Sequence, residues 1–321
     1  MSDHDPHRPT GDISDAQAFD MPWAGQLSFG RAQTHRRVDE IDLAIVGVPY
    51  DIATTNRPGA RSGPRAVREQ SSLSAEFSQG LWPWDHSLFD RHRVVDYFDV
   101  GYAPGDTQAM LTNVIDHVGR LVKAGANVLT LGGDHLIAYP VLTATAAVHG
   151  PLSLIHFDAH SDTWDAGAEL NHGTMFLRAA RDGIIVPERS VQIGMRTPNV
   201  THGFNVIHAD RFFAIGIEET LAEIHRIVGD HRCYVTFDID FLDPAYAPGT
   251  GTPVIGGPTT WQARQLLWGL ADLDVVGADL VEVAPAYDAV TQITALAGAT
   301  LAHDELYLLG LARERRQAAS R

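Results

Sequence analysis

The chain has a single cysteine, few basic residues and no long hydrophobic run. Cys233 is its one cysteine in 321 residues, which excludes a disulfide framework and a cysteine-based zinc site and fits a reducing compartment. Lysine and arginine number 24 against 40 acidic residues, for a net charge of −16, which argues against nucleic acid or an anionic membrane as a partner. No stretch approaches the roughly 18 apolar residues of a membrane span, and the polar first residues do not have the pattern of an export signal. We therefore expect a cytoplasmic protein with neither a nucleic-acid nor a membrane partner.

The hydrophobic content of the chain is sufficient for a large core. At 45% of the residues it suits one large α/β domain or two small ones. Residues 1–20 are polar and include Pro6, Pro9 and Gly11, which predicts a mobile N-terminal arm. The rest of the chain has no internal repeat, low-complexity linker or break in composition. We therefore expect residues 21–321 to form a single domain.

Short β-branched runs alternate with amphipathic stretches through this domain. Thr259 with Gln262 predicts a capping box at the start of one helix, and Pro64 suits the first turn of another. The expected strands are residues 42–48, 94–98, 128–131, 152–157, 190–193, 205–208, 233–237 and 275–281, and the expected helices include 107–123, 217–228, 261–271 and 293–315. This alternation predicts a three-layer α/β/α fold with a mostly parallel central sheet of about eight strands.

Three of the expected strands lead into side chains that bind metal ions. Alternate residues of an extended strand point the same way, and the carboxyl ends of parallel strands face the functional crevice of such a sheet. Four carboxylates and two imidazoles should therefore converge at one edge. They are Asp158, His160 and Asp162 after the run 152–157, Asp238 and Asp240 after the run 233–237, and His135 after the run 128–131.

Such a group of carboxylates requires cations. Held together without counter-ions, carboxylates repel by roughly 4 kcal/mol per close pair at the effective dielectric of a protein surface. Oxygen and imidazole ligands without a thiolate suit Mn²⁺ better than a structural zinc, and there are enough of them for two ions that share carboxylates. A pair of such ions lowers the pKa of bound water. The expected reaction class is therefore hydrolysis.

Four motifs in order resemble the ureohydrolases, the family of arginase, agmatinase and their relatives. The similarity extends from about Val46 to Leu309, and Asn171 stands where some members of the agmatinase branch carry an aspartate. The motifs are GGDH at 132–135, DAHSD at 158–162, TFDIDFLDPAYAPGTGTPVIGG at 236–257 and DLVEVAPAYD at 279–288. NHGTMF at 171–176 and GVPYDIATTNRPGARSGP near the start resemble the agmatinase branch in detail.

The resemblance implies an arginase-like fold with two Mn²⁺ ions per chain. Asp158 and Asp238 would bridge the two ions. One ion would be bound by His135, Asp158, Asp162 and Asp238, and the other by Asp158, His160, Asp238 and Asp240. The implied assembly is a homo-oligomer, either a trimer or a hexamer.

The resemblance also assigns two catalytic residues that would contact a small cationic guanidino substrate. His172 matches the proton-shuttling histidine of the family, and Glu282 matches its guanidinium-binding glutamate. A carboxylate can accept a planar guanidinium through two hydrogen bonds, although ion pairing to a nearby arginine is the competing interpretation of Glu282. The implied reaction converts agmatine into putrescine and urea.

Other functions are open at this point. A hydrolase of a guanidino acid such as 4-guanidinobutyrate would need the same residues, because the chemistry ends at the guanidinium, and Arg57 or Arg61 could receive its carboxylate. The acidic balance of the chain favours the cationic substrate, and the loop TTNRPGA does not resemble the arginase segment that handles an α-amino acid. The complete ligand set disfavours an inactive regulatory homologue, and the lack of a His-His pair disfavours a zinc deacetylase.

Overall fold

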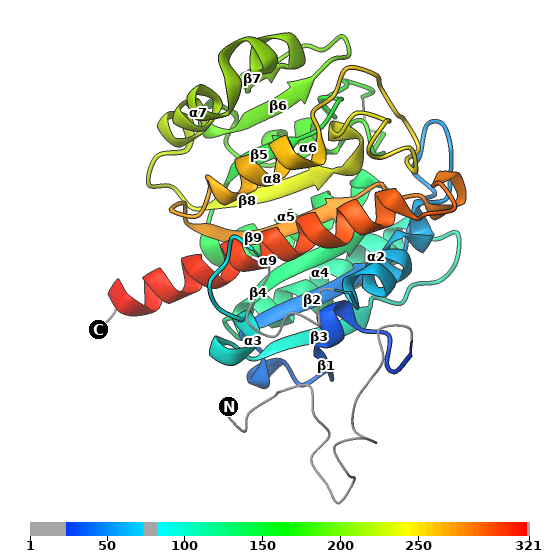
Figure 1. Cartoon of the computed structure of the whole chain (residues 1–321), viewed down its shortest axis with the longest axis vertical. Coiled ribbons are helices and arrows are strands. Elements are labelled where there is room, and N and C mark those ends of the chain that lie inside the picture. The colour runs from blue at the N-terminus through cyan, green and yellow to red at the C-terminus, as the bar shows by residue number, and fades with distance from the viewer. Residues whose placement is uncertain (1–23, 74–81, 168, 320–321) are drawn as a thin grey trace, which may run out of the picture.

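A nine-stranded sheet forms the centre of the computed structural model, which describes residues 24–73, 82–167 and 169–319. Every pair of neighbouring strands is parallel, in the order β1-β3-β2-β4-β9-β8-β5-β6-β7 (Figure 1). The strands are β1 Gln33–Thr34, β2 Leu43–Val48, β3 Val94–Asp99, β4 Asn127–Gly132, β5 Ser153–Phe157, β6 Val191–Met195, β7 Asn205–His208, β8 Cys233–Asp238 and β9 Val275–Val281. The arm expected over residues 1–20 lies outside the described residues.

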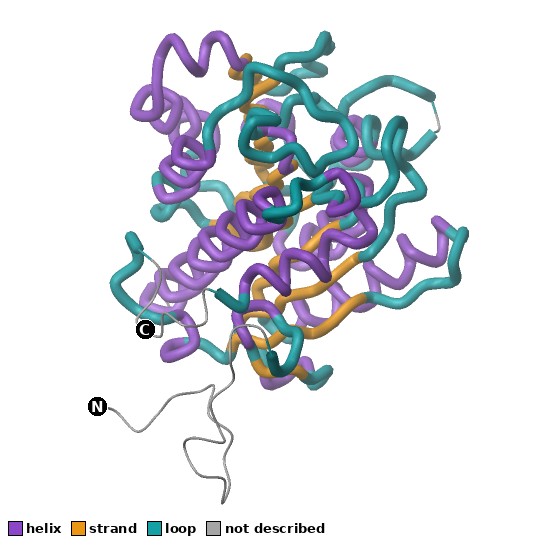
Figure 2. Tube along the Cα trace, turned by 45° about the vertical axis from the view of Figure 1, so that its right-hand side comes forward, coloured by secondary structure: helices purple, strands orange, loops and turns teal. Residues whose placement is uncertain are grey.

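Helices cover both faces of this sheet and bury a separate core on each (Figure 2). Helices α2, α7, α8 and α9 contribute to the core that contains Ile155 and Phe237, whereas α4, α5 and α6 contribute to the core that contains Val128 and Tyr234. The helices are α2 Gly63–Ser71, α3 Leu88–Arg91, α4 Thr107–Lys123, α5 Ala138–His149, α6 Met175–Arg181, α7 Ala209–Val228, α8 Thr260–Trp268 and α9 Ile293–Ala319. The predicted three-layer α/β/α architecture is confirmed.

The structure differs from the prediction by one additional short strand and by the ends of some helices. The additional strand, β1, has only two residues and pairs with β3, so no hydrophobic run marks it. Element α7 consists of two helical segments that meet at a kink at Gly216, where φ is 78°, so the predicted helix from residue 217 is its second segment and the first, from Ala209, was not predicted. Helix α8 ends at Trp268 instead of residue 271, and α9 extends to Ala319 instead of residue 315.

The four strands that precede the predicted site residues are neighbours in the middle of the sheet. Their order is β4-β9-β8-β5, so β8 and β9 lie between two strands that come earlier in the chain. After β4 the chain crosses to β5 through α5 and leaves the space that β8 and β9 fill later. A crevice for ligands forms at such a point, outside the carboxyl ends of the strands.

The predicted capping box of α8 gives a test of local stability. Thr259 Oγ1 accepts a hydrogen bond from the Gln262 N–H at 3.1 Å, and Gln262 Oε1 accepts one from the Thr259 N–H at 3.0 Å. Thr259→Ala should therefore lower the free energy of unfolding by about 1 kcal/mol, measured by chemical denaturation. Thr260→Ala, one residue later, is the matched control, and an equal loss from both changes would contradict this role of the cap.

Candidate active site

The six predicted metal-binding side chains come together at the carboxyl ends of β4, β5 and β8. Around His135, Nδ1 lies 2.8 Å from Asp162 Oδ2, 3.2 Å from Asp158 Oδ2 and 3.4 Å from Asp238 Oδ2. All four residues of this first group are buried. The side chains are thus close enough for one ion to contact them together.

A second group shares Asp158 with the first. His160 Nδ1 lies 3.1 Å from Asp240 Oδ2 and 3.4 Å from Asp158 Oδ1. Asp158 therefore offers one carboxylate oxygen to each group, as a bridging ligand would. Asp238 approaches the first group through Oδ2, while its Oδ1 accepts a hydrogen bond from the Asp240 N–H at 2.8 Å.

Tight turns, and not strand alternation alone, bring these residues together. β5 ends at Phe157, and Asp162 has a φ of 51°, in the left-handed region. Asp238 is the last residue of β8, and Asp240 lies in the 3₁₀ helix Ile239–Phe241 that follows it. The expectation that both motifs continue as extended strands is thus wrong in detail, although the convergence that it predicted is present.

The neutral ring of His135 would present a nitrogen lone pair to the first group. Its Nε2 lies 2.8 Å from Thr236 Oγ1, which donates to Asp279 Oδ1 at 2.6 Å. Because the Thr236 proton is used by Asp279, Thr236 accepts from His135 Nε2–H, so in the neutral ring Nδ1 carries the lone pair. Despite its three carboxylate neighbours, Nδ1 has no hydrogen-bond partner in the described part of the chain, which is the state of a metal-ligating imidazole.

The electrostatics of the cluster also fit divalent cations. Burial raises the pKa of Asp238 well above its usual value, and the charges on Asp240 and Asp158 raise it further. Burial and the charge on Asp158 likewise raise the pKa of Asp240. These shifts express carboxylate repulsion in a dry environment, and a cation among the oxygens would favour their charged forms.

Glu282 lies at the end of β9 with its carboxylate beside the first group. Its φ is 64°, and its N–H donates to the Gly133 carbonyl at 2.8 Å. Oε1 accepts from the His135 N–H at 2.9 Å and is 2.8 Å from His172 Nδ1. Oε2 is buried and has no partner within the described ranges. The partners of Glu282 are thus histidines and not the arginine of the competing interpretation.

His172 lies between a carboxylate and a backbone amide. The Thr55 N–H points at Nε2 at 2.9 Å, so Nε2 accepts and Nδ1–H donates to Glu282. Burial lowers the pKa of His172, but the hydrogen bond and charge of Glu282 outweigh it and raise the pKa to about 9. The Thr55 N–H opposes a proton on Nε2. Glu282 thus favours the protonated ring, whereas the Thr55 N–H disfavours it. Such a balance suits a group that gains and releases a proton.

Two buried side chains that the sequence analysis did not select also adjoin the first group. His156 Nε2 lies 2.8 Å from Asp158 Oδ2, and the Phe176 ring packs edge-on against both His156 and His135, with centroids 4.6 and 5.1 Å away. His156 continues the alternate spacing of the DAHSD motif by one step toward the N-terminus, which is the signal that could have identified it. Phe176 is the last residue of NHGTMF, and its position explains part of that motif.

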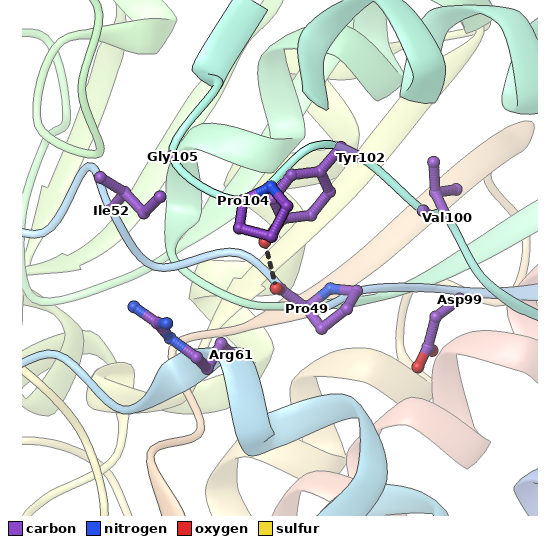
Figure 3. Close-up of a pocket in the computed structure, with 9 residues that line it drawn as sticks. Pro49, Ile52, Arg61, Asp99, Val100, Tyr102, Pro104 and Gly105 are labelled. Atoms are coloured by element: carbon purple, nitrogen blue, oxygen red, sulfur yellow. Dashed lines mark hydrogen bonds between the residues drawn. The ribbon is translucent and has the colours of Figure 1, made fainter. Parts of the chain in front are cut away.

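A pocket of about 350 Å³ lies between the loop that follows β2 and the loop that follows β3 (Figure 3). Its lining includes Ile52, Arg61 and Tyr102 but none of the predicted site residues. Arg61 forms an ion pair at 2.5 Å with the buried carboxylate of Asp51, so it already has an anionic partner. The guanidinium of Arg57, in contrast, stacks over the ring of Tyr287, 5.4 Å from its centroid.

Comparisons with known proteins show what kind of protein carries this site. The model of the arginase family matches residues 41–307. The agmatinase of Edwardsiella ictaluri is 51% identical over 270 residues, which cover 84% of this chain and 88% of that protein. The chain belongs to the arginase family. The predicted relationship to the ureohydrolases and the expectation of a hydrolase that acts on the C–N bond of a linear amidine are thereby confirmed.

Solved structures agree with this membership. A hypothetical agmatinase from Burkholderia thailandensis superposes with a TM-score of 0.88 at 48% identity, covering 92% of this chain and 94% of that one. Arginase from Bacillus caldovelox superposes with a TM-score of 0.71 at 25% identity, covering 84% and 98%. The arginase-like fold is thus confirmed.

Within the described residues, each helix of this family member is too short or too polar to span a bilayer.

Proposed function

We propose that this arginase-family chain hydrolyses agmatine to putrescine and urea, with two Mn²⁺ ions per chain. The observation that carries the proposal is the position of Asp158, whose two oxygens face two different groups of metal-binding side chains. The similarity to an agmatinase at 51% identity supports the substrate. A cytoplasmic homo-oligomer, trimer or hexamer, is part of the same proposal.

The predicted residues keep their assigned roles in this proposal. Asp158 and Asp238 would serve both ions. His135 and Asp162 would complete the first site, and His160 and Asp240 the second. When bound, the pair of ions supplies a water molecule of lowered pKa as the nucleophile.

Glu282 would bind the guanidinium of the substrate through Oε2. The sequence suggested a contact with both oxygens, but Oε1 already accepts from His135 N–H and lies within hydrogen-bond distance of His172 Nδ1. The approach to Oε2 depends on Gly251, because a Cβ there would lie 3.5 Å from Oε2 and 2.9 Å from the Arg57 carbonyl oxygen. A buried carboxylate oxygen without a donor is costly, and a guanidinium N–H would satisfy it.

His172 would protonate the departing amine. It shares its Nδ1 proton with Glu282, so the same carboxylate that binds the guanidinium also orients the imidazole. Nε2 faces Thr55, whose hydroxyl oxygen is 2.7 Å away. This contact gives a proton a short path between the Thr55 hydroxyl and Nε2. To act as a general acid, His172 must give up the hydrogen bond from the Thr55 N–H to Nε2 and carry a proton on Nε2 instead.

Metal stoichiometry is the first test. Elemental analysis should find two Mn²⁺ per active chain, and chelation should abolish urea formation, because the donor set exceeds what one tetrahedral ion uses. Asp158→Asn or Asp238→Asn should be more damaging than His135→Asn, since each carboxylate serves both ions. Asp165→Asn, an exposed change in the same loop, is the control. Full activity with one ion per chain would contradict the two-ion mechanism.

The second test separates proton transfer from metal binding. His172→Ala should lower kcat by at least about 10²-fold, because it removes a general acid and not a ligand. Metal content, measured on the same preparation, should stay at two ions per chain. A variant that loses one ion would show that His172 is a ligand and that the assigned roles are incorrect.

The third test concerns the far end of the substrate. kcat/KM should favour agmatine over 4-guanidinobutyrate and arginine by at least about tenfold, because an unpaired anion in an acidic, partly buried crevice costs free energy that an ammonium does not. One urea assay with three substrates measures it. If 4-guanidinobutyrate were preferred, Arg57→Met should remove that preference, since Arg61 is committed to Asp51.

A further inference from the structure

His156 is a fully buried residue of β5 that has no role in the proposed reaction. Its Nε2 lies 2.8 Å from Asp158 Oδ2. It also belongs to a group with His135, Asp158 and Asp162 whose potential ligand atoms all lie within 4.8 Å of one another. By proximity alone it could be a fifth ligand of the first ion. The hydrogen bonds on its other side decide between a ligand and a donor.

Gln192 on β6 fixes the tautomer of His156. The Gln192 Nε2 amide donates to the Ser161 carbonyl oxygen at 2.6 Å and lies 3.1 Å from His156 Nδ1. The carbonyl of Ser161 can only accept, so the side chain of Gln192 must present its NH₂ group in this direction. Its second hydrogen then points at His156 Nδ1, which accepts. In the neutral ring the proton consequently resides on Nε2.

We propose that His156 is a positioning residue that donates Nε2–H to Asp158 and does not bind the metal itself. The inference rests on the proposed two-ion site. A nitrogen that carries a proton has no lone pair for a metal ion, and an N–H directed at Asp158 Oδ2 is the outer-shell arrangement that orients a ligating carboxylate.

The donors around Asp158 match what a bridging carboxylate requires. His156 Nε2–H occupies one lone pair of Oδ2, and the His160 N–H donates to Oδ1 at 2.6 Å. Each oxygen therefore keeps one lone pair, and Oδ2 faces the group around His135 whereas Oδ1 faces His160. The two donors thus hold the plane of the carboxylate so that each oxygen can serve one ion.

The packing around His156 keeps this donor in place. Its ring packs edge-on against Phe176 and against His135, with centroids 4.6 and 5.2 Å away. Phe176, Gln192 and His156 are each fully buried. The imidazole cannot turn without breaking either these contacts or the bond to Gln192, so its direction toward Asp158 is set by the core.

Three variants of the full chain test the inference. His156→Phe keeps a buried ring without a donor, His156→Gln restores an amide N–H near the place of Nε2, and Gln192→Leu removes the group that fixes the tautomer. Each chelated protein is titrated with Mn²⁺, and the electron paramagnetic resonance signal of the free ion gives stoichiometry and affinity. Thermal unfolding of the chelated variants controls for the fold.

The wild type should bind two ions. His156→Phe should also bind two, with affinity weakened by about 10- to 100-fold, while His156→Gln should recover most of that loss and Gln192→Leu should fall between them. Loss of one ion in both His156 variants would show that His156 is itself a metal ligand. Wild-type affinity in His156→Phe would show that His156 has no positioning role. If His156→Phe fails to fold, the Gln192→Leu titration decides, with wild-type affinity overturning the inference. A wild type that does not bind two ions would overturn the proposed function instead.

Discussion

The repulsion among buried carboxylates at the middle of the sheet is the constraint on which the functional edge depends. Asp158, Asp238 and Asp240 are buried together, and the raised pKa values of the last two reflect both desolvation and mutual charge. Such a cluster is tolerable only when donors and cations meet its oxygens. The fold supplies the donors from turn amides and from imidazoles. It leaves the remaining lone pairs directed at two points, which is the physical basis for expecting two ions.

The loops around this cluster are held by a few close contacts. In the GGDH motif, a Cβ on Gly133 would lie 1.7 Å from the Tyr50 carbonyl oxygen, so only glycine fits there. Asp134 then accepts from the Ala53 N–H at 2.9 Å, which joins the loop after β4 to the loop after β2. Glu282 holds an uncommon positive φ while its side chain contacts both neighbouring histidines. Strained backbone of this kind persists where surrounding contacts determine it.

The layers and the convergence of the acidic and histidine side chains could be predicted from the sequence because both depend on local patterns. Buried parallel strands leave apolar runs, and the side chains that cluster at the site follow those runs directly. β1 escaped prediction because two residues form no run, and the first segment of α7 escaped because Gly216 separates it from the rest of the helical pattern. The role of His156 escaped because it depends on Gln192, which lies on another strand. Contacts between strands cannot be read from spacing along one of them.

The same distinction explains why reaction and substrate differ in how far sequence reasoning reaches. The residues proposed to react lie at strand ends, where the register of a parallel sheet fixes them. The far end of the substrate would meet loops, where the partner of each charge decides its effect. Arg57 and Arg61 are four positions apart and look equivalent in the sequence, yet Arg61 is paired with the buried Asp51 while Arg57 stacks on Tyr287. Under the proposed function, selectivity for charge at the far end of the substrate would therefore depend on which arginine is already neutralised, a property of the folded loop and not of its composition.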